Sequence, residues 1–332
     1  MEFHLLTTLI LGGAGFVGLN IAEALMASGQ SVVLFDRSAP PPAFVEHHAA
    51  GGLLTVVQGD ATDAAAVHAA AKGCDTLVHG AAITAGPDRE TTDPGLILAV
   101  NNGSLVPALE AARDEGMKRV VILSSGAAYG DAGFIHDDLD EDTPCDPVGL
   151  YSITKFASER IARRLGTLWK VDVRVVRLSA VFGPWERDTG VRDTLSPHFR
   201  IMQAVSRGEP LILNRAAVRD WIYAPDVGTA IAGLLAVEAP QYPVYNISTG
   251  DRWTVLDWAK IVAGLTGTEA SMAGPGETPT VPVKDSGDRA PMRIERMLAD
   301  LPPARNSGCE DSARAYLDWW KTFGPAVVGD VA

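Results

Sequence analysis

A tyrosine and a lysine four residues apart are the side chains whose types and spacing most directly suggest chemistry. Tyr151 and Lys155 begin and end the run YSITK at the start of a predicted helix. Residues i and i+4 share one face of a helix, so the phenol and the ammonium can reach the same site. A nearby ammonium stabilises a phenolate, which makes Tyr151 a candidate proton shuttle to a substrate hydroxyl or carbonyl.

A glycine-rich loop follows the first predicted strand and opens the first predicted helix. Its sequence, GGAGFVG, has the spacing G-x-x-G-x-x-G on Gly12, Gly15 and Gly18. Glycines let the backbone turn tightly and approach a pyrophosphate, whose charge the helix N-terminus stabilises. Asp36 ends the second predicted strand, where a carboxylate can bind the hydroxyls of an adenine ribose. The pattern therefore predicts a dinucleotide site, the alternative being a structural glycine turn.

Two adjacent residues bear on which dinucleotide binds. Asp36 would repel the 2′-phosphate of NADP, whereas Arg37 is of the type that usually binds this phosphate. We expect the carboxylate to dominate, so the predicted cofactor is NAD.

Nearly continuous apolar runs alternate with helical patterns over the first 180 residues. Such runs are typical of parallel strands that helices cover on both faces. The alternation predicts a doubly wound parallel sheet with right-handed crossovers. The predicted strands span 5–11, 31–35, 53–57, 76–78, 119–123 and 171–179, and the predicted helices span 17–27, 63–71, 96–114 and 150–165.

The pattern becomes irregular after residue 183. Predicted helices span 197–207, 226–237, a segment from 255, and 312–323, and predicted strands span 218–223 and 244–247. We expect an α/β fold with a Rossmann-like NAD-binding domain at 1–180. A smaller substrate-binding lobe at 181–332 would be interleaved with late Rossmann elements. The long loops 126–147 and 183–196 are candidates for functional segments.

Composition excludes several classes of protein. The 332 residues carry a net charge of −13, with 47% hydrophobic and 21% charged residues, as in soluble globular proteins. The acidic total argues against binding to nucleic acid or anionic membranes. No run of 18 apolar residues and no basic leader is present, so we expect a cytoplasmic protein. The spacing of the three cysteines and of the acidic run 137–142 predicts no metal site.

Further ordered motifs resemble one family. They include GD at 59–60, HGAA at 79–82, SSGAAYG at 124–130, VFGP at 181–184, RDWIY at 219–223 and YNI at 245–247. With the glycine loop and YSITK, they resemble the extended short-chain dehydrogenase/reductases, the NAD-dependent epimerase/dehydratase family, from about residue 9 to 265.

The resemblance implies roles for individual residues. Ser125 would polarise the reacting oxygen beside Tyr151, and Lys155 would hold the nicotinamide ribose. The cofactor-binding residues would be Gly12, Gly15, Phe16, Val17, Gly18, Asp36, Arg37, Asp60, Ala61, Ala81, Ala82, Asn101, Tyr151 and Lys155. The substrate-binding residues would be Thr84, Ser125, Gly126, Ser179, Arg187, Arg192 and Arg219. Members of this family commonly form two-fold dimers, here through 96–114 and 150–165.

Departures from the family pattern narrow the expected substrate. The 4,6-dehydratases carry Asp and Glu where this chain has Gly126 and Ala127, so dehydration is not expected. Ala180 and Thr194 stand where many nucleotide-sugar members have Asn, whereas Arg219 matches a diphosphate-binding Arg. The two arginines of 185–193 can bind a carboxylate, or they belong to an internally paired, solvated loop.

Three functions are compatible with these residues. The first is an NAD-dependent oxidoreductase acting on a secondary alcohol or ketone of a sugar, sugar acid or polyol-like substrate. The second is a nucleotide-sugar 4-epimerase, which oxidises and re-reduces one carbon without releasing NADH. The third, a catalytically silent dinucleotide-sensing protein, has no need of the intact Ser125, Tyr151 and Lys155.

Overall fold

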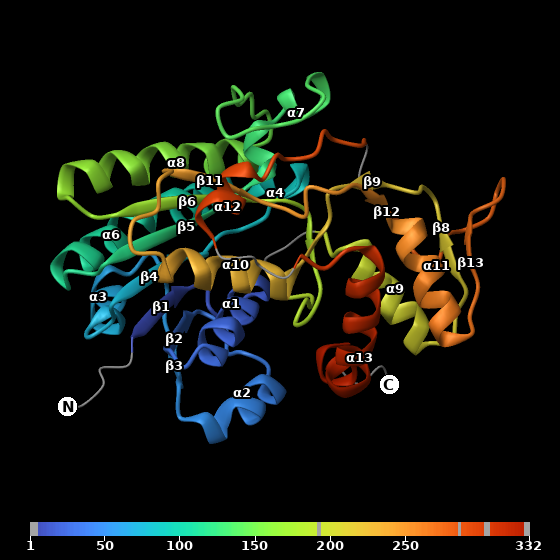
Figure 1. Ribbon diagram of the computed structural model, residues 1–332, viewed down its shortest axis with the longest axis horizontal. Coiled ribbons are helices and arrows are strands. Elements are labelled where there is room, and N and C mark those ends of the chain that lie inside the picture. The colour runs from blue at the N-terminus through green and yellow to red at the C-terminus, as the bar shows by residue number, and fades with distance from the viewer. Residues whose placement is uncertain (1–5, 191–193, 285–286, 302–305, 329–332) are drawn as a thin grey trace.

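A seven-stranded parallel sheet forms the centre of the computed structural model, which describes residues 6–190, 194–284, 287–301 and 306–328 (Figure 1). Its strand order is β3-β2-β1-β4-β5-β6-β11. The strands are β1 (Thr7–Leu11), β2 (Ser31–Asp36), β3 (Leu54–Gln58), β4 (Thr76–His79), β5 (Arg119–Ser125), β6 (Val173–Leu178) and β11 (Val244–Ile247). The order reverses between β1 and β4, where doubly wound sheets bind ligands beyond their carboxyl ends. The predicted fold class is confirmed.

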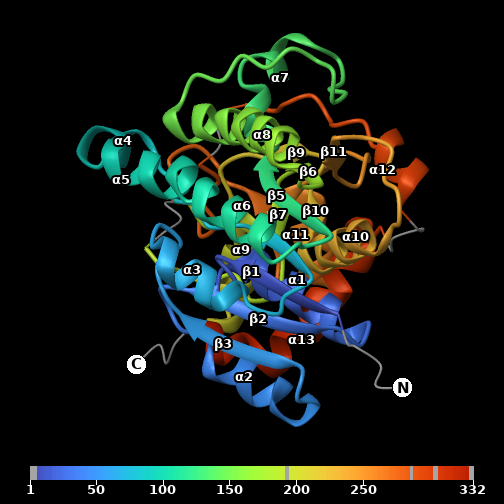
Figure 2. The same ribbon diagram turned by 90° about the vertical axis from the view of Figure 1, so that its left-hand side faces the viewer.

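Helices cover both faces of this sheet (Figures 1 and 2). One face carries α3 (Ala64–Ala71), α6 (Leu105–Asp114) and α8 (Leu150–Trp169). The other carries α1 (Phe16–Ala27) and α10 (Ala224–Ala236). These two helices approach closely, because a Cβ on Gly228 of α10 would lie 2.3 Å from the backbone oxygen of Asn20. The segments after residue 180 thus contribute α10 and β11 to the central layers, and the predicted boundary there stays a prediction.

The predicted helix 96–114 is interrupted. It consists of α5 (Pro94–Leu98), a π-helical turn (Ala99–Gly103) and α6, and a short helix, α4 (Pro87–Thr92), precedes it. The whole stretch Pro94–Asp114 is long and apolar enough to cross a membrane by composition alone. However, 56% of its most apolar window is buried inside the fold, as in the core helix of a soluble protein.

A smaller lobe stands beside the carboxyl ends of the strands, on the right of Figure 1. It contains α9 (Pro197–Ser206), α11 (Val255–Thr266) and α13 (Cys309–Val328). Three two-stranded sheets accompany them: β7 (Val181–Phe182) with β10 (Ile222–Tyr223), β8 (Leu211–Leu213) with β13 (Ala270–Met272), and β9 (Val218–Arg219) with β12 (Trp253–Thr254). The remaining short helices are α2 (Pro42–His48), η1 (Ala49–Gly51), η3 (Gly126–Tyr129), α7 (Ala132–Ile135) and α12 (Glu295–Asp300).

The prediction of one strand over 218–223 was wrong. Its two ends pair in different sheets, as β9 and β10. Between them the buried carboxylate of Asp220 accepts hydrogen bonds from Ser248 Oγ at 2.6 Å and from the backbone of Met292 at 3.0 Å. These partners, rather than a continuous ladder, stabilise the turn.

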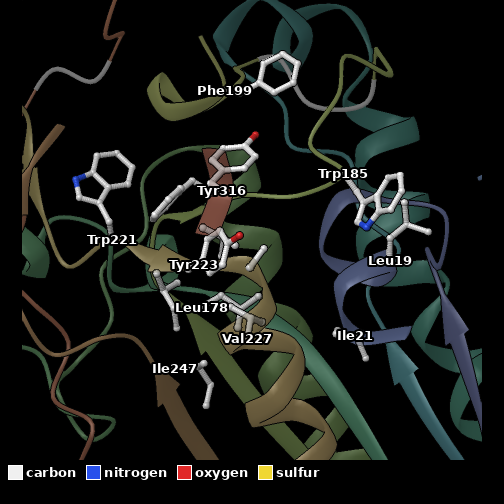
Figure 3. Close-up of a cluster of buried hydrophobic side chains, with 14 of the residues drawn as sticks. Leu19, Ile21, Leu178, Trp185, Phe199, Trp221, Tyr223, Val227, Ile247 and Tyr316 are labelled. Atoms are coloured by element: carbon white, nitrogen blue, oxygen red, sulfur yellow. The ribbon is translucent and has the colours of Figure 1, made fainter. Parts of the chain in front are cut away.

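Aromatic side chains join the lobe to the sheet (Figure 3). The ring centroids of Tyr223 and Tyr316 lie 6.2 Å apart, above Leu178 of β6. Trp185 is fully buried beside Leu19 of α1, although its backbone has a φ of +64°. A buried tryptophan in this left-handed conformation anchors the start of the loop that enters the site.

Candidate active site

The glycine loop forms a cradle that side chains would fill. Gly12 has a φ of +78°, and a Cβ there would lie 2.7 Å from the backbone nitrogen of Ala81. A Cβ on Gly18 would lie 2.6 Å from the oxygen of Gly12, so α1 can only pack this closely on the loop with glycine at this position. The exposed helix N-terminus and the bare backbone fit a dinucleotide pyrophosphate.

Two carboxylates stand at the ends of the strands beside this loop. Asp36 Oδ2 accepts a hydrogen bond from Ala14 N at 3.2 Å. Asp60 Oδ1 accepts hydrogen bonds from the backbone and hydroxyl of Thr62, both at 2.8 Å, and the backbone bond is the main cause that lowers the pKa of Asp60. Both side chains line a cavity of about 130 Å³ together with Gly12, Gly15, Arg37, Ala61, Ala81 and Ala82. The residues predicted to hold the adenosine end of the cofactor therefore line one cavity.

A second cavity of about 440 Å³ shares Gly12, Gly15 and Ala82 with the first. The three candidate catalytic residues, Ser125, Tyr151 and Lys155, line it. So do the predicted cofactor and substrate residues Phe16, Val17, Gly18, Thr84, Ser179, Arg187 and Arg219. A ligand in this cavity would lie between the glycine loop, β5, α8 and the lobe.

Lys155 is held beside Tyr151 by the end of β5. Its Nζ, which is buried, donates to the backbone oxygen of Leu123 at 2.7 Å and lies 5.8 Å from the centroid of the Tyr151 ring. Ser125 Oγ accepts a hydrogen bond from Ala127 N at 3.1 Å. This arrangement gives one wall of the cavity a phenol, an ammonium and a hydroxyl, the groups that move a proton at an alcohol or ketone.

A buried ion pair fixes α8 behind this wall. Glu159 of α8 pairs with Arg177 of β6 at 2.7 Å and accepts a hydrogen bond from Ser124 Oγ at 2.5 Å.

His79, at the end of β4, makes a 2.8 Å hydrogen bond between its Nε2 and Ser104 Oγ. Burial, with a smaller contribution from the charge of Lys155, lowers the pKa of His79 to about 4. His79 is therefore neutral and packed.

Two predicted residues, Asn101 and Gly126, line neither cavity. The amide of Asn101 is buried and bonds both backbone groups of Ile83 and the hydroxyl of Thr154. Asn101 is thus a positioning residue, because it ties the strand end after β4 to α8. Gly126 contributes its backbone oxygen to the guanidinium of Arg289 at 2.9 Å.

Arg187 lies at the junction of the two cavities. Its Nη2 donates to the backbone oxygen of Ala14 at 2.7 Å, whereas its Nη1 is buried without a hydrogen-bond partner among the described residues. Burial lowers the pKa of Arg187, and the charge of Asp36 opposes this effect. Arg187 therefore presents a donor at the glycine loop, where a pyrophosphate would lie. Arg192 lies outside the described residues.

Three contributing residues escaped the sequence analysis. Glu90 of α4 caps the N-terminus of α8, Glu186 accepts two hydrogen bonds from Ser196, and Arg289 lines the larger cavity. Only the cap had a local signal: Gly149, the residue before α8, has no side chain that could cap the helix.

Comparisons with known proteins identify relatives over most of the chain. Residues 8–248 match the NAD dependent epimerase/dehydratase family. The chain is 30% identical over 270 residues to the low-salt glycan biosynthesis protein Agl12 of Haloferax volcanii, covering 79% of this chain and 83% of that protein. It is 25% identical over 291 residues to the dTDP-L-rhamnose 4-epimerase of Burkholderia thailandensis, covering 77% of this chain and 80% of that protein.

A solved structure extends this similarity to nearly the full length. The structure of MoeE5 in complex with UDP-glucuronic acid and NAD superposes with a TM-score of 0.75 at 26% identity, covering 95% of this chain and 99% of that chain. The match of 8–248 and the glycine cradle agree on the same cofactor. The chain belongs to the NAD-dependent epimerase/dehydratase family, and it is an NAD-dependent enzyme of the extended short-chain dehydrogenase/reductase type.

Proposed function

We propose that this enzyme oxidises a secondary hydroxyl, or reduces the corresponding ketone, on a sugar carried by a nucleoside diphosphate. The observation that carries the proposal is the convergence of Ser125, Tyr151 and Lys155 on a cavity that the glycine loop also lines. Proton transfer and cofactor would thus meet at one place.

Each of the three residues has a separate task in this proposal. Tyr151 takes the hydroxyl proton during oxidation and returns it during reduction. Lys155, held by Leu123 O, stabilises the phenolate and holds the nicotinamide ribose. Ser125 donates a hydrogen bond to the reacting oxygen. Bound NAD would accept the hydride during oxidation, and NADH would return it during reduction.

The nucleotide-sugar class is supported by the relatives and by one arginine. A dTDP-L-rhamnose 4-epimerase and a structure with bound UDP-glucuronic acid are among the similar proteins. Arg219 lines the cavity at the position where the family resemblance places a diphosphate ligand. Gly126 and Ala127 supply no carboxylate for elimination of water, which argues against a dehydratase.

A substrate panel tests the proposal. Free sugars, aldonates, UDP-sugars and dTDP-sugars are incubated with the enzyme and NAD, and NADH is followed by its absorbance. Nucleotide sugars are expected to be turned over. Turnover of free sugars or aldonates alone would contradict the nucleotide-sugar class.

A 4-epimerase is the second candidate. The relatives favour it, because a dTDP-L-rhamnose 4-epimerase and a UDP-glucose 4-epimerase are among the similar proteins. An epimerase retains NAD through purification and converts one nucleotide sugar into its epimer without net NADH, which NMR of the product detects. A dehydrogenase exchanges NAD and accumulates NADH.

We also infer a cytoplasmic two-fold dimer. Exposed apolar side chains on α5, α6 and α8, namely Leu96, Leu98, Val106, Ile153 and Ile161, supply the apolar surface for a second copy. The three cysteines are free thiols, which suits a reducing compartment. A monomer mass by light scattering at micromolar concentration would contradict the dimer.

A further inference from the structure

Arg289 enters the larger cavity from a segment whose backbone is tightly held. Ala290 N donates to the oxygen of Gly133 at 2.8 Å on one side. Met292 N donates to Asp220 Oδ2 at 3.0 Å on the other side. The backbone of Arg289 is therefore fixed before any ligand binds.

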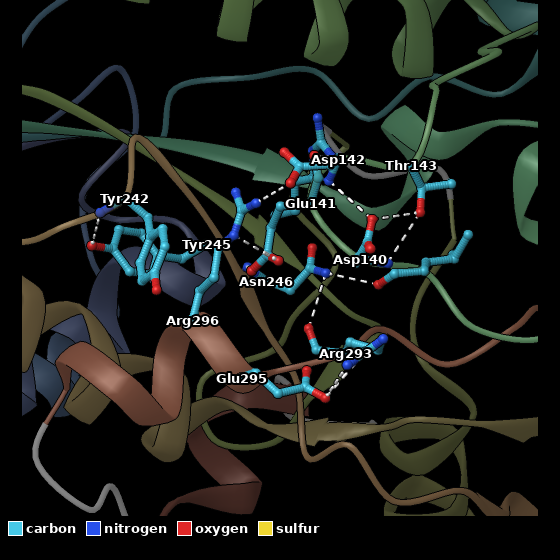
Figure 4. A network of polar contacts seen from close by, with 12 residues as sticks. Asp140, Glu141, Asp142, Thr143, Tyr242, Tyr245, Asn246, Arg293, Glu295 and Arg296 are labelled. Atoms are coloured by element: carbon cyan, nitrogen blue, oxygen red, sulfur yellow. Dashed lines mark hydrogen bonds and ion pairs between the residues drawn. The ribbon is translucent and has the colours of Figure 1, made fainter.

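The residues that follow Arg289 are fixed as well. Leu139 N donates to the oxygen of Pro291, and Leu139 O accepts a hydrogen bond from Arg293 N, both at 2.9 Å. The side-chain amide of Asn246 donates to the oxygens of Leu139 and Arg293, both at 3.0 Å (Figure 4). This network connects β11, the loop that carries the acidic run 137–142, and the segment before α12. The position of Arg289 is therefore preorganised.

The side chain of Arg289 contacts Gly126, which follows the candidate catalytic residue Ser125. Its Nη1 donates to the oxygen of Gly126, the residue after Ser125, at 2.9 Å. Gly133 makes room for it, because a Cβ there would lie 3.1 Å from Arg289 Cδ. A guanidinium has five N–H donors, so it can hold Gly126 and ligand oxygens together.

Charge in this cavity is strongly positive, although the whole chain is acidic. Among the described residues that line it, the cations are Lys155, Arg187, Arg219 and Arg289. The single carboxylate is that of Glu186, which is buried and accepts hydrogen bonds from Ser196 N at 2.7 Å and Ser196 Oγ at 2.5 Å. The cavity thus favours a ligand with several negative charges.

The four cations lie at different places around the cavity. Lys155 stands at Tyr151, and Arg187 stands at the glycine loop. Arg219 stacks over Trp221, with its guanidinium carbon 5.9 Å from the ring centroid. Arg289 alone among these is bonded to the turn that follows Ser125, which is the side of the cavity where the proposed function places the reacting sugar.

We propose that Arg289 binds a carboxylate on the reacting sugar, so that the substrate is a nucleotide-linked sugar acid. This inference rests on the proposed function and narrows its substrate class. A guanidinium can donate two parallel N–H groups to the two oxygens of a carboxylate, and the backbone on either side of Arg289 is already held in place. A neutral hexose offers only hydroxyls at the same position.

Calorimetric titration of the NAD-loaded enzyme tests this specificity. The probes are UDP-glucose and UDP-glucuronic acid, dTDP-glucose and dTDP-glucuronic acid, and free UDP and dTDP. With the nucleotide that the enzyme binds, the acid is expected to bind about 10–100-fold more tightly than the neutral sugar. In Arg289→Gln this preference should disappear, while the affinity for the neutral sugar and the free nucleotide stays unchanged.

Two further variants separate specificity from a general loss of structure. Arg289→Lys keeps the charge but loses the paired donors, so it should retain part of the preference. Arg293→Gln is the matched control, because Arg293 lies four residues after Arg289 on the same segment and its exposed guanidinium pairs with Glu295. It should behave as wild type.

The outcomes distinguish the inference from the function on which it rests. Equal affinity of the wild type for acid and neutral sugar would overturn the role of Arg289 and leave the proposed function intact. If Arg289→Gln instead lost affinity equally for the acid, the neutral sugar and the free nucleotide, this arginine would be assigned to the diphosphate. Failure of every nucleotide sugar to bind would overturn the proposed function itself.

Discussion

Tyr151 is the residue on which the proposed chemistry depends most directly. Tyr151→Phe keeps the ring beside Lys155 but removes the transferable proton. General acid–base catalysis contributes about 10²–10⁴-fold, so we expect turnover to fall by this factor while NAD binding is unchanged. Steady-state kinetics and NAD titration measure the two effects separately. Turnover close to that of the wild type would mean that the proton moves by another route.

Substitutions of the two neighbouring candidate catalytic residues should reduce turnover by different amounts. Lys155→Met should reduce both turnover and NAD affinity, because the ammonium is proposed to serve the ribose and the phenol together. Ser125→Ala should cost less than either, since it removes one hydrogen bond and leaves the proton shuttle in place. A larger loss in Ser125→Ala than in Tyr151→Phe would contradict this assignment of roles.

Asp36 should set the preference between the two nicotinamide dinucleotides. Its carboxylate lines the adenosine cavity and accepts a hydrogen bond from the glycine loop. We expect a lower KM for NAD than for NADP, and Asp36→Asn should narrow the difference because the repulsion of a 2′-phosphate is removed. Comparable KM values in the wild type would show that Arg37 dominates.

At the scale of secondary structure, the start of α8 depends on a side chain from another helix. Glu90 Oε1 accepts hydrogen bonds from Leu150 N at 2.7 Å and Tyr151 N at 3.4 Å. Gly149 provides no cap of its own, so this carboxylate satisfies the exposed N–H groups and interacts favourably with the helix dipole. The cap acts on the same turn that carries Tyr151.

Removal of this cap should therefore affect both stability and catalysis. Glu90→Ala is expected to lower the free energy of unfolding by about 0.5–2 kcal/mol and to reduce kcat more than the KM for NAD. Glu90→Gln, which keeps an acceptor oxygen, should restore most of kcat. Asp88→Ala, an exposed change on the same short helix, is the control in denaturation and kinetic assays. Identical effects of both alanine variants would exclude a specific role for Glu90.

At the scale of the whole molecule, a buried histidine should make the stability of the fold depend on pH. His198 of α9 is stacked on Phe182, with ring centroids 3.8 Å apart, and Trp221, Trp253 and Trp258 surround it. Its two ring nitrogens have no hydrogen-bond partner among the described residues, and burial lowers its pKa well below 6.5.

The sign of the resulting pH dependence is determined by the unfolded chain. Below pH 6.5 the unfolded state binds a proton at His198 that the folded state does not, so stability falls as pH falls. The pKa of His79 is lowered from 6.5 to about 4, so His79 adds an effect of the same sign between these two pH values. Each such group changes the free energy of unfolding by about 1.4 kcal/mol per pH unit.

His198→Phe should flatten this dependence. A phenyl ring keeps the aromatic packing and cannot be protonated, so the loss of stability between pH 7 and pH 5 should shrink by about 2 kcal/mol. Urea denaturation at both pH values measures it, with the exposed His136→Gln as control. An unchanged loss in His198→Phe would show that the ring does not titrate in this range.

Much of the site is predictable from sequence because its geometry is local. The spacing of Gly12, Gly15 and Gly18 sets a turn within seven residues, and Tyr151 and Lys155 share a helix face through the pitch of α8. The strands from β1 to β6 were placed to within a few residues, because buried parallel strands are nearly continuously apolar. The sequence by itself therefore determined the sheet, the glycine loop and the placing of Tyr151 beside Lys155, whose role in proton transfer is the proposal.

Only the tertiary structure decided which distant groups complete the site. Glu90 caps α8 from 60 residues away, and Arg289 bonds Gly126 across 163 residues. Asn101 ties the strand end after β4 to α8, and the predicted strand at 218–223 is split between two sheets. Helix pitch and strand alternation record only what neighbours along the chain do, whereas these contacts depend on how separate elements pack against one another.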